Sequence, residues 1–289
     1  MKLPRVPSPS TIRRDYDLRA RTGIGQHFLA RNEILQKIAH AAKIRADEST
    51  VIEIGMGPGY LTAHLIAEEP RRLIALEMER RFSNLIDSVF GEFSNMCVEY
   101  GDALKQDFAA LVRADGAETE RDLVIVGNIP YQITSPLLFK IWECGLPWRR
   151  AVLMVQKEMA ERLTAERGTG DHGILTLKGR YFAETDILFD VGRRAFDPPP
   201  RVDSAVIVMT PREDQPYDET TRQRFFTLIN GAFAQKRKTI VNSLCGSPPF
   251  PIEKEQLLAA LERCGIDPQA RAQTLTLDDF QRLFAALMD

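Results

Sequence analysis

The sequence has few of the residues that bind metals or form disulfides. Its four cysteines and four histidines show none of the CxxC, HxxxH or HExxH spacings of metal sites. No apolar run approaches the roughly 18 residues that a membrane-spanning helix needs, and the N-terminus lacks the apolar core of a secretory signal. We therefore expect no bound metal, no disulfide framework and no membrane span, but a soluble protein of a reducing compartment.

An excess of charge of one sign is also lacking. The formal net charge is −2 at pH 7, which argues against the overall basic character of many nucleic-acid-binding domains. Basic residues gather locally instead. Residues 1–31 contain seven lysines and arginines against two aspartates, and further clusters occur at 236–238 and at Arg193, Arg194 and Arg201. Such patches can bind phosphate within a neutral protein, although solvated surface charge is the alternative for each of them.

Short apolar strands alternate with helical patterns over residues 51–155. Strands are expected at 51–54, 73–76, 96–100, 123–126 and 151–155, with helices between them. Further strands are expected around 185–191 and 204–209. This alternation predicts an α/β fold with a mostly parallel sheet covered by helices on both faces.

The composition and the hydrophobic periodicity of the chain change toward both ends. Residues 1–22 contain prolines and arginines but no sustained apolar period, so we expect an arm without a core of its own, which orders only on a partner. Residues 23–211 hold the strands. From 212 onward a polar linker leads to helical periodicities around 222–244, 253–264 and 276–287, which predict a small all-helical domain over 212–289.

A glycine-rich turn, residues 55–59, follows the first expected strand. Such a turn lets a ligand approach the backbone and directs amides toward it. The dinucleotide pattern GxGxxG is not met, because Tyr60 stands where its third glycine belongs. Glu77 ends the second strand, about twenty residues beyond the glycines, where a carboxylate can accept both ribose hydroxyls. We expect this carboxylate to be solvent-accessible before a ligand binds.

Polar side chains also end the next two parallel strands. Asp102 follows the strand 96–100 and can accept a hydrogen bond from an adenine amino group. Asn128-Ile129-Pro130-Tyr131 follows the run 123–126 and offers an amide, a rigid carbonyl and a flat ring, which suit a planar nucleobase. The alternative is an ordinary turn with Asn128 as a cap and Pro130 at the first helical position. Because Glu77, Asp102 and Asn128 all lie at strand carboxyl ends, we favour a site.

Six motifs of this chain resemble those of the rRNA adenine N6,N6-dimethyltransferases. In chain order they are Gly25-Gln26-His27-Phe28-Leu29, the turn at Gly55, Asn128-Ile129-Pro130-Tyr131, Gln156-Lys157-Glu158, the segment 196–205 and Gln235-Lys236-Arg237-Lys238-Thr239. The similarity covers roughly residues 23–285. It implies a class I S-adenosylmethionine-dependent methyltransferase with a Rossmann-like, mostly parallel seven-stranded sheet. The regions would be a basic arm (1–22), a catalytic domain (23–211) and a helical rRNA-binding domain (212–289).

The resemblance also implies an activity. The substrates would be two adjacent adenosines in the loop of the 3′-terminal helix of small-subunit rRNA, free or in an immature 30S particle, with a role in small-subunit biogenesis. A cytoplasmic monomer is the expected form. Two groups of site residues follow from the resemblance: cofactor-binding His27, Leu29, Gly55, Glu77, Asp102 and Asn128, and catalytic Asn128, Pro130 and Tyr131. The family usually has Phe and Asn where Ile24 and His27 stand, which affects side-chain detail at the cofactor.

This chemistry requires alignment rather than a general base, because the sulfonium methyl is already activated. Tyr181 or Phe182 could form the opposite wall of the pocket, with core packing as the alternative. Three other functions remain open: a large-subunit rRNA adenine methyltransferase of the antibiotic-resistance type, a mitochondrial relative acting in transcription, and a ribosome-assembly factor that mainly binds. The basic helical domain favours the small-subunit enzyme, and an intact Asn128–Tyr131 motif speaks against a factor that only binds.

Overall fold

A computed structural model of the chain describes residues 3–21, 23, 25–113, 122–245 and 252–288. It divides into two compact units. Unit 1 comprises Met1–Ala160 and Asp186–Pro211, and unit 2 comprises Glu161–Thr185 and Arg212–Asp289. The second unit thus includes residues 161–185, which the sequence grouped with the strands. Among the described residues, no helix is long and apolar enough to cross a membrane.

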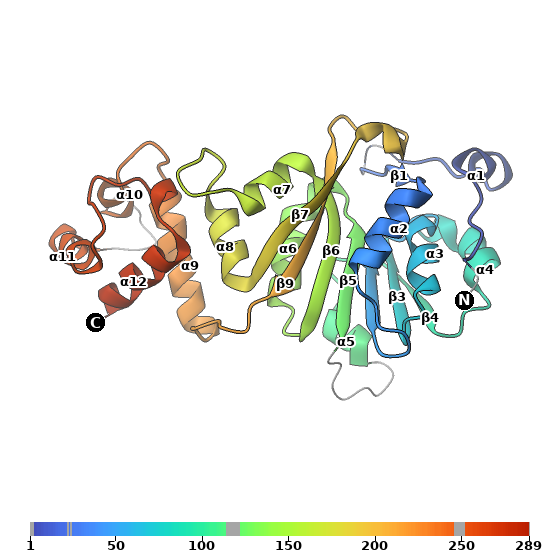
Figure 1. Ribbon diagram of the computed structural model, residues 1–289, viewed down its shortest axis with the longest axis horizontal. Helices are drawn as coiled ribbons and strands as arrows, with labels where there is room; N and C mark the ends of the chain where they lie inside the picture. Colours follow the sequence, from blue (N-terminus) through green and yellow to red (C-terminus); the bar gives the residue numbers. More distant parts are fainter. Residues whose placement is uncertain (1–2, 22, 24, 114–121, 246–251, 289) are drawn as a thin grey trace. The chain divides into compact units, whose positions relative to one another are not determined.

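A seven-stranded sheet forms the centre of the α/β part (Figure 1), in the order β4-β3-β2-β5-β6-β9-β7. Neighbours from β4 through β6 pair in parallel, and β9 runs antiparallel to β6. The predicted α/β fold and mostly parallel sheet are confirmed. The strand bounds are β2 Thr50–Ile54, β3 Arg72–Glu77, β4 Met96–Tyr100, β5 Leu123–Asn128, β6 Trp148–Gln156, β7 Ala183–Val191 and β9 Ser204–Pro211.

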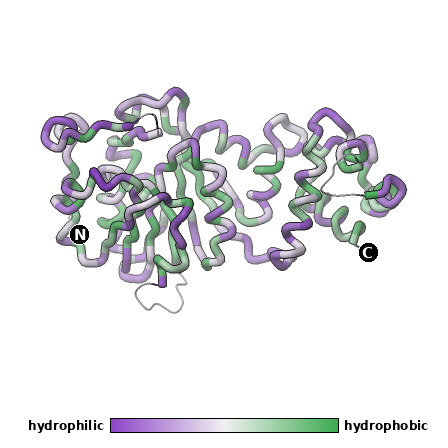
Figure 2. Tube along the Cα trace, turned by 180° about the vertical axis from the view of Figure 1, so that it is seen from behind, coloured by the Kyte–Doolittle hydropathy of each residue, from purple (hydrophilic) through white to green (hydrophobic). Residues whose placement is uncertain are grey.

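Helices follow most of the strands and bury their apolar sides. Helices α2 and α3 pack on the sheet with Leu35, Ile38 and Leu65. All five residues of β2 are buried, as expected for a central parallel strand covered on both faces. The hydropathy colouring of Figure 2 shows apolar strands and largely polar connecting loops. The helices are α1 Pro9–Asp15, α2 Asn32–Ala41, α3 Tyr60–Ala67, α4 Ser83–Phe90, α5 Phe108–Arg113, α6 Thr134–Glu143 and α7 Lys157–Thr164, and the short 3-10 turns are η2 Arg80–Phe82, η3 Tyr131–Ile133 and η4 Arg193–Ala195.

The N-terminal segment contributes to the core of unit 1. Ser8 caps α1 by accepting a hydrogen bond from the Thr11 amide, and Pro9 occupies the first turn. Ile12 and Leu18 are buried in the cluster that contains Phe82 of η2. The expectation that this segment orders only on a partner is therefore wrong for residues 3–21, which pack on the core of unit 1; residues 1–2 and 22 lie outside the described part. The physical reason is that two apolar side chains suffice to dock a short capped helix on an existing core.

Unit 2 is helical and has an aromatic core. Its helices are α8 Ile174–Phe182, α9 Glu219–Phe233, α10 Ile240–Cys245, α11 Lys254–Cys264 and α12 Leu277–Met288, with the turn η5 Ala272–Thr274. The Tyr181 ring lies 5.2 Å from Phe182 and 5.2 Å from Phe226, centroid to centroid. Both Tyr181 and Phe182 are buried in this core, so packing and not a pocket wall explains them.

The helix expected over 222–244 is two helices. Helix α9 ends at Phe233, and α10 begins at Ile240 after the Thr239 hydroxyl accepts a hydrogen bond from the Asn242 amide. The polar stretch between them forms a turn closed by the Lys238 amide, which donates to the Gln235 carbonyl. Lys236, Arg237 and Lys238 are therefore exposed on a turn rather than on a helix face.

Candidate active site

A cavity of about 280 Å³ lies in unit 1, at the carboxyl ends of the parallel strands. The strand ends of β2, β3 and β5 border it, together with the residues after β4 and the N-terminal segment 25–29. This is the edge at which open α/β sheets bind ligands. All the residues predicted to bind the cofactor or to take part in catalysis line this cavity: His27, Leu29, Gly55, Glu77, Asp102, Asn128, Pro130 and Tyr131.

The glycine turn between β2 and α3 depends on conformations that only glycine adopts easily. Gly55 has φ +79° and Gly59 has φ +91°. A Cβ at Gly55 would lie 3.3 Å from the Asn128 carbonyl oxygen, and one at Gly59 would overlap the Phe90 ring. The turn therefore brings bare backbone to the cavity. Tyr60, in the place of a third glycine, donates its hydroxyl to the Pro7 carbonyl at 2.9 Å and so holds the N-terminal segment.

Glu77 is buried at the end of β3, with 4% of its surface exposed. One carboxylate oxygen accepts the Gly57 amide at 2.6 Å, and the other accepts the Glu79 amide at 2.8 Å. The expected accessibility of this group is thus wrong, because the glycine turn folds over it. Burial raises the pKa of Glu77 above its ordinary value, and the backbone hydrogen bonds oppose this shift. Each oxygen retains acceptor capacity toward the cavity.

The N-terminal segment meets Asn128 and the segment around Pro198. The side-chain nitrogen of Asn128, Nδ2, donates to the His27 carbonyl at 3.3 Å. This bond orients the side chain and leaves its oxygen as an acceptor. His27 Nδ1 lies 2.8 Å from the Pro198 carbonyl, so this nitrogen carries the proton. Leu29 is buried in β1 (Phe28–Leu29), which pairs with β8 (Phe196–Asp197). Ile24, at a position where the family usually has Phe, lies outside the described residues. Asp102 accepts the Leu104 amide at 3.0 Å.

Pro130 and Tyr131 form the remaining wall. The Pro130 carbonyl accepts the Ile133 amide at 3.0 Å, which fixes its direction while a second lone pair remains. The Tyr131 hydroxyl lies 2.8 Å from the Ser204 hydroxyl, and its ring stacks toward His27 with centroids 6.4 Å apart and planes 22° apart. Burial raises the pKa of the Tyr131 phenol, and the bond to Ser204 acts in the opposite direction. The phenol is therefore protonated at neutral pH.

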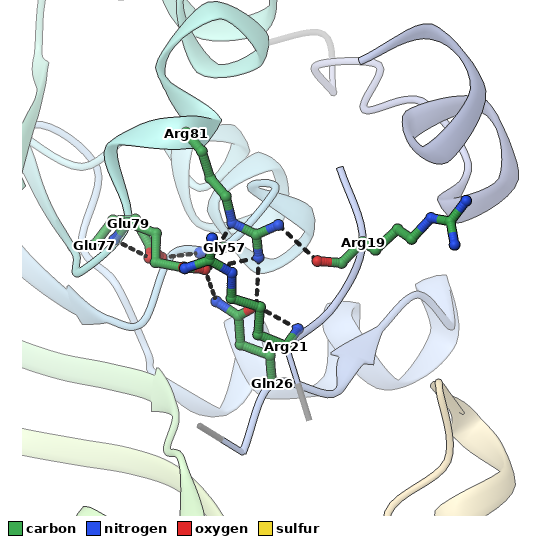
Figure 3. A network of polar contacts seen from close by, with 7 residues as sticks. All are labelled: Arg19, Arg21, Gln26, Gly57, Glu77, Glu79 and Arg81. Carbon is green, nitrogen blue, oxygen red and sulfur yellow. Dashed lines mark hydrogen bonds and ion pairs between the residues drawn. The ribbon is translucent and has the colours of Figure 1, made fainter. Parts of the chain in front are cut away.

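Sequence reasoning missed a charge network beside Glu77 (Figure 3). Glu79 accepts from Arg21 at 2.5 Å, from Gln26 at 2.6 Å and from Arg81 Nε at 2.8 Å. Arg81 also donates to the Gln26 side-chain oxygen at 2.7 Å. Charged residues after a strand usually belong to the solvated surface, so the pattern gave no signal for Glu79 or Arg81. Gln26 belonged to a motif, but its partner was not predictable.

The strand order, the glycine turn and the carboxylate ending the second strand define a class I S-adenosylmethionine-dependent methyltransferase. Residues 17–289 match the family model for ribosomal RNA adenine dimethylase. The chain belongs to the ribosomal RNA adenine dimethylase family.

Individual relatives agree with this membership. The chain is 38% identical to ribosomal RNA small subunit methyltransferase A of Geobacillus thermodenitrificans, over 94% of this chain and 92% of that protein. It is 37% identical to the protein of the same name from Bacillus mycoides, over 94% and 93%. Among solved structures, a dimethyladenosine transferase from Plasmodium falciparum matches with TM-score 0.73 and 30% identity, over 89% and 96% of the two chains. The 23S rRNA methyltransferase ErmE matches with TM-score 0.67 and 26% identity, over 91% and 100%.

The residues present fit the cofactor of this class. The cavity combines an apolar wall with a buried carboxylate at a strand end and a turn whose backbone is not shielded by side chains. A neutral or hydroxyl-bearing ligand could use the acceptors of Glu77 and Asp102, and a cationic one is favoured by their charge. The chain is an S-adenosylmethionine-dependent rRNA adenine methyltransferase.

Proposed function

We propose that this protein methylates N6 of two adjacent adenosines in the loop of the 3′-terminal helix of small-subunit rRNA, giving N6,N6-dimethyladenosine. The main observation behind this proposal is that Glu77 and Asp102, which can accept hydrogen bonds from a cofactor, line the same cavity as the segment Asn128–Tyr131. The similarity to proteins named ribosomal RNA small subunit methyltransferase A favours the small subunit as the source of the substrate. A role in small-subunit biogenesis follows from that substrate.

The cofactor would be held by residues at the ends of β2, β3 and β4 and by the N-terminal segment 25–29. In this proposal Glu77 accepts the ribose hydroxyls, Asp102 accepts the adenine amino group, and Gly55 receives the methionine part. His27 and Leu29 close the site from the N-terminal segment. The cofactor supplies an activated methyl group on a sulfonium cation. The task of these residues is to hold it in one orientation, since positioning can supply roughly 7–11 kcal/mol of a barrier.

The target side would be formed by Asn128, Pro130 and Tyr131. In the first methyl transfer the Asn128 side-chain oxygen and the Pro130 carbonyl accept the two N6 hydrogens and direct the nitrogen lone pair into the cavity. In the second transfer one of these acceptors holds the single N6 hydrogen that remains, and each transfer ends with the loss of one N6 proton to water. These acceptors gain strength as N6 becomes positively charged, so they favour the transition state over the ground state. Tyr131 stacks on the base. Its protonated phenol, hydrogen-bonded to Ser204, is not required as a base.

The adenosine must leave its stack to reach this wall, which costs a few kcal/mol unless a loop already exposes it. A loop at the end of an rRNA helix meets that condition. The proposal further includes an immature 30S particle as the substrate, a monomeric enzyme and a cytoplasmic location.

Methyl mapping tests the proposal. Purified 30S subunits lacking the modification are incubated with the protein and S-adenosylmethionine carrying a labelled methyl group, and 50S subunits are treated in parallel. We expect label as dimethyladenosine at two adjacent positions near the 3′ end of 16S rRNA. Label confined to 23S rRNA would support the large-subunit activity instead. Tight binding of 30S subunits without label in either rRNA would support a factor that only binds.

A further inference from the structure

A second carboxylate lies next to the proposed ribose acceptor. Glu79 is almost buried, with 8% of its side-chain surface exposed. Its amide donates to Glu77, so the two acidic residues are neighbours within the protein, and the charge of Glu79 opposes ionisation of Glu77. Ionising two adjacent carboxylates in a largely buried site has a high free-energy cost unless counterions are present.

Arg81 supplies the better shielded of two counterions. Its guanidinium contacts Glu79 through Nε at 2.8 Å and Nη2 at 2.7 Å, with only 21% of its side chain exposed. Arg21 also contacts Glu79 but is 64% exposed, so solvent weakens its interaction. The remaining guanidinium nitrogen of Arg81, Nη1, donates to the Arg19 carbonyl at 2.7 Å, so the Arg81 side chain also contacts the N-terminal segment (Figure 3).

Other charges around Glu77 do not replace this pair. Burial raises the pKa of Glu53 on β2 to about 8, so this side chain carries little charge at pH 7. Tyr100 at the end of β4 is neutral, since burial raises the pKa of its phenol. Arg80 is exposed and stacks on the Tyr100 ring at 5.0 Å rather than contacting Glu79. The titratable and charged groups around Glu77 thus include Glu53, Glu79, Arg21, Arg80, Arg81 and Tyr100, and Asp102 lines the same cavity.

We propose that Arg81 is a positioning residue for cofactor binding, which neutralises Glu79 and thereby keeps Glu77 ionised and aimed at the ribose hydroxyls. The inference rests on the proposed role of Glu77 and adds a residue that does not itself touch the cofactor. Gln26 and the Arg19 carbonyl, held by the same guanidinium, join the N-terminal wall of the cavity to its carboxylate wall.

The test is calorimetric binding of S-adenosylmethionine to the full chain between pH 5.5 and 8.5, without RNA. Binding weakens on the acid side as Glu77 becomes protonated. Arg81→Met should raise the pKa of Glu77 and move this acid-side loss upward by about one pH unit, so that binding weakens by up to about tenfold at the acid end of the range and changes little at pH 8.5. Glu79→Gln, which removes the opposing negative charge, should move the loss to lower pH. The double variant should return toward wild type.

Arg80→Met is the matched control, because it removes the same charge from the same turn without touching Glu79. It should leave the pH profile near wild type. The inference is overturned if Arg81→Met weakens binding equally at every pH, or if Arg80→Met shifts the profile as much. If Arg81→Met does not fold, two other variants test the inference. Arg81→Lys keeps the positive charge and should leave the pH profile near wild type, and Glu79→Gln should move the acid-side loss to lower pH. Glu77→Ala with wild-type affinity would instead remove Glu77 from the cofactor site, a failure of the proposed function itself.

Discussion

Glu53 is a neutral acid at the centre of the sheet. It is fully buried on β2, where one carboxyl oxygen accepts the Thr62 hydroxyl at 2.7 Å. Within the described part of the chain, the other oxygen has no hydrogen-bond partner. Burial raises the pKa of Glu53 from 4.5 to about 8, with the hydroxyl of Thr62 opposing and Glu77 adding to the shift. A polar group in this position makes stability depend on pH.

The direction of that dependence follows from the raised pKa. Because the folded state holds the proton more tightly than the unfolded state, the contribution is fully present below pH 4.5 and is lost as pH rises through about 8. Each pKa unit corresponds to about 1.4 kcal/mol, so wild type should lose a few kcal/mol over this window. Glu53→Gln cannot ionise and should lose none of this. Urea unfolding at pH 5, 6.5 and 8 measures the difference.

The control for this prediction is Glu92→Gln, at an exposed carboxylate in the turn after α4. Its free energy of unfolding should follow wild type at each pH. If the curves of Glu53→Gln and wild type run parallel from pH 5 to 8, Glu53 is ionised in the folded state and the interpretation fails.

Tyr131 offers two properties that substitution can separate. Tyr131→Phe removes only the hydroxyl bonded to Ser204 and should retain much of the methylation rate. Tyr131→Ala removes the ring and should lose the roughly 1–3 kcal/mol that base stacking contributes. Single-turnover rates on 30S subunits measure both. A severe defect in Tyr131→Phe, with a rate that titrates at alkaline pH, would mean that the phenol transfers a proton and that the alignment mechanism is wrong.

Among the elements, α1 shows how little sequence is needed to attach a segment to a core. Ile12 is 2% exposed and packs with Leu85 and Phe82. Truncating a buried isoleucine leaves a cavity, so Ile12→Ala should lower the free energy of unfolding by roughly 2–5 kcal/mol. Leu3→Ala, at a residue that is 44% exposed, is the control and should change the free energy of unfolding by less than about 0.5 kcal/mol. Equal and small effects of the two variants in denaturant unfolding would mean that residues 3–21 are not part of the cooperative unit.

The parallel strands of the sheet could be predicted because each is a short apolar run followed by a helical period. Their position at strand ends predicts that Glu77, Asp102 and Asn128 lie at one edge of the sheet, and all three line the cavity. Features that depend on tertiary partners were not predictable. Ile12 and Leu18 show no helical period, and the burial of Glu77 results from the glycine turn folding over it. The break between α9 and α10 depends on the cap at Thr239, which a continuous apolar period conceals.

At the scale of the whole molecule, a net charge of −2 gives no general attraction for RNA. Any affinity for a ribosomal particle must therefore come from local groups of cations. The turn between α9 and α10 presents Lys236, Arg237 and Lys238 together, and all three side chains are exposed. Their exposure on a turn, without a partner carboxylate among the ion pairs of the described residues, favours a role in phosphate binding.

Replacing Lys236, Arg237 and Lys238 together by Ala should weaken binding to 30S subunits and flatten its dependence on salt. Each phosphate contact that is lost reduces the slope of log K against log salt by about 0.7–0.9, because fewer counterions are released. Filter binding between 50 and 200 mM KCl measures affinity and slope. Lys254→Ala, an exposed lysine of the same unit, is the control with at most one contact removed. The affinity for S-adenosylmethionine should not change, since the cavity is formed by unit 1 alone. If the triple variant keeps the wild-type affinity and slope, the turn is solvated surface and the rRNA is held elsewhere.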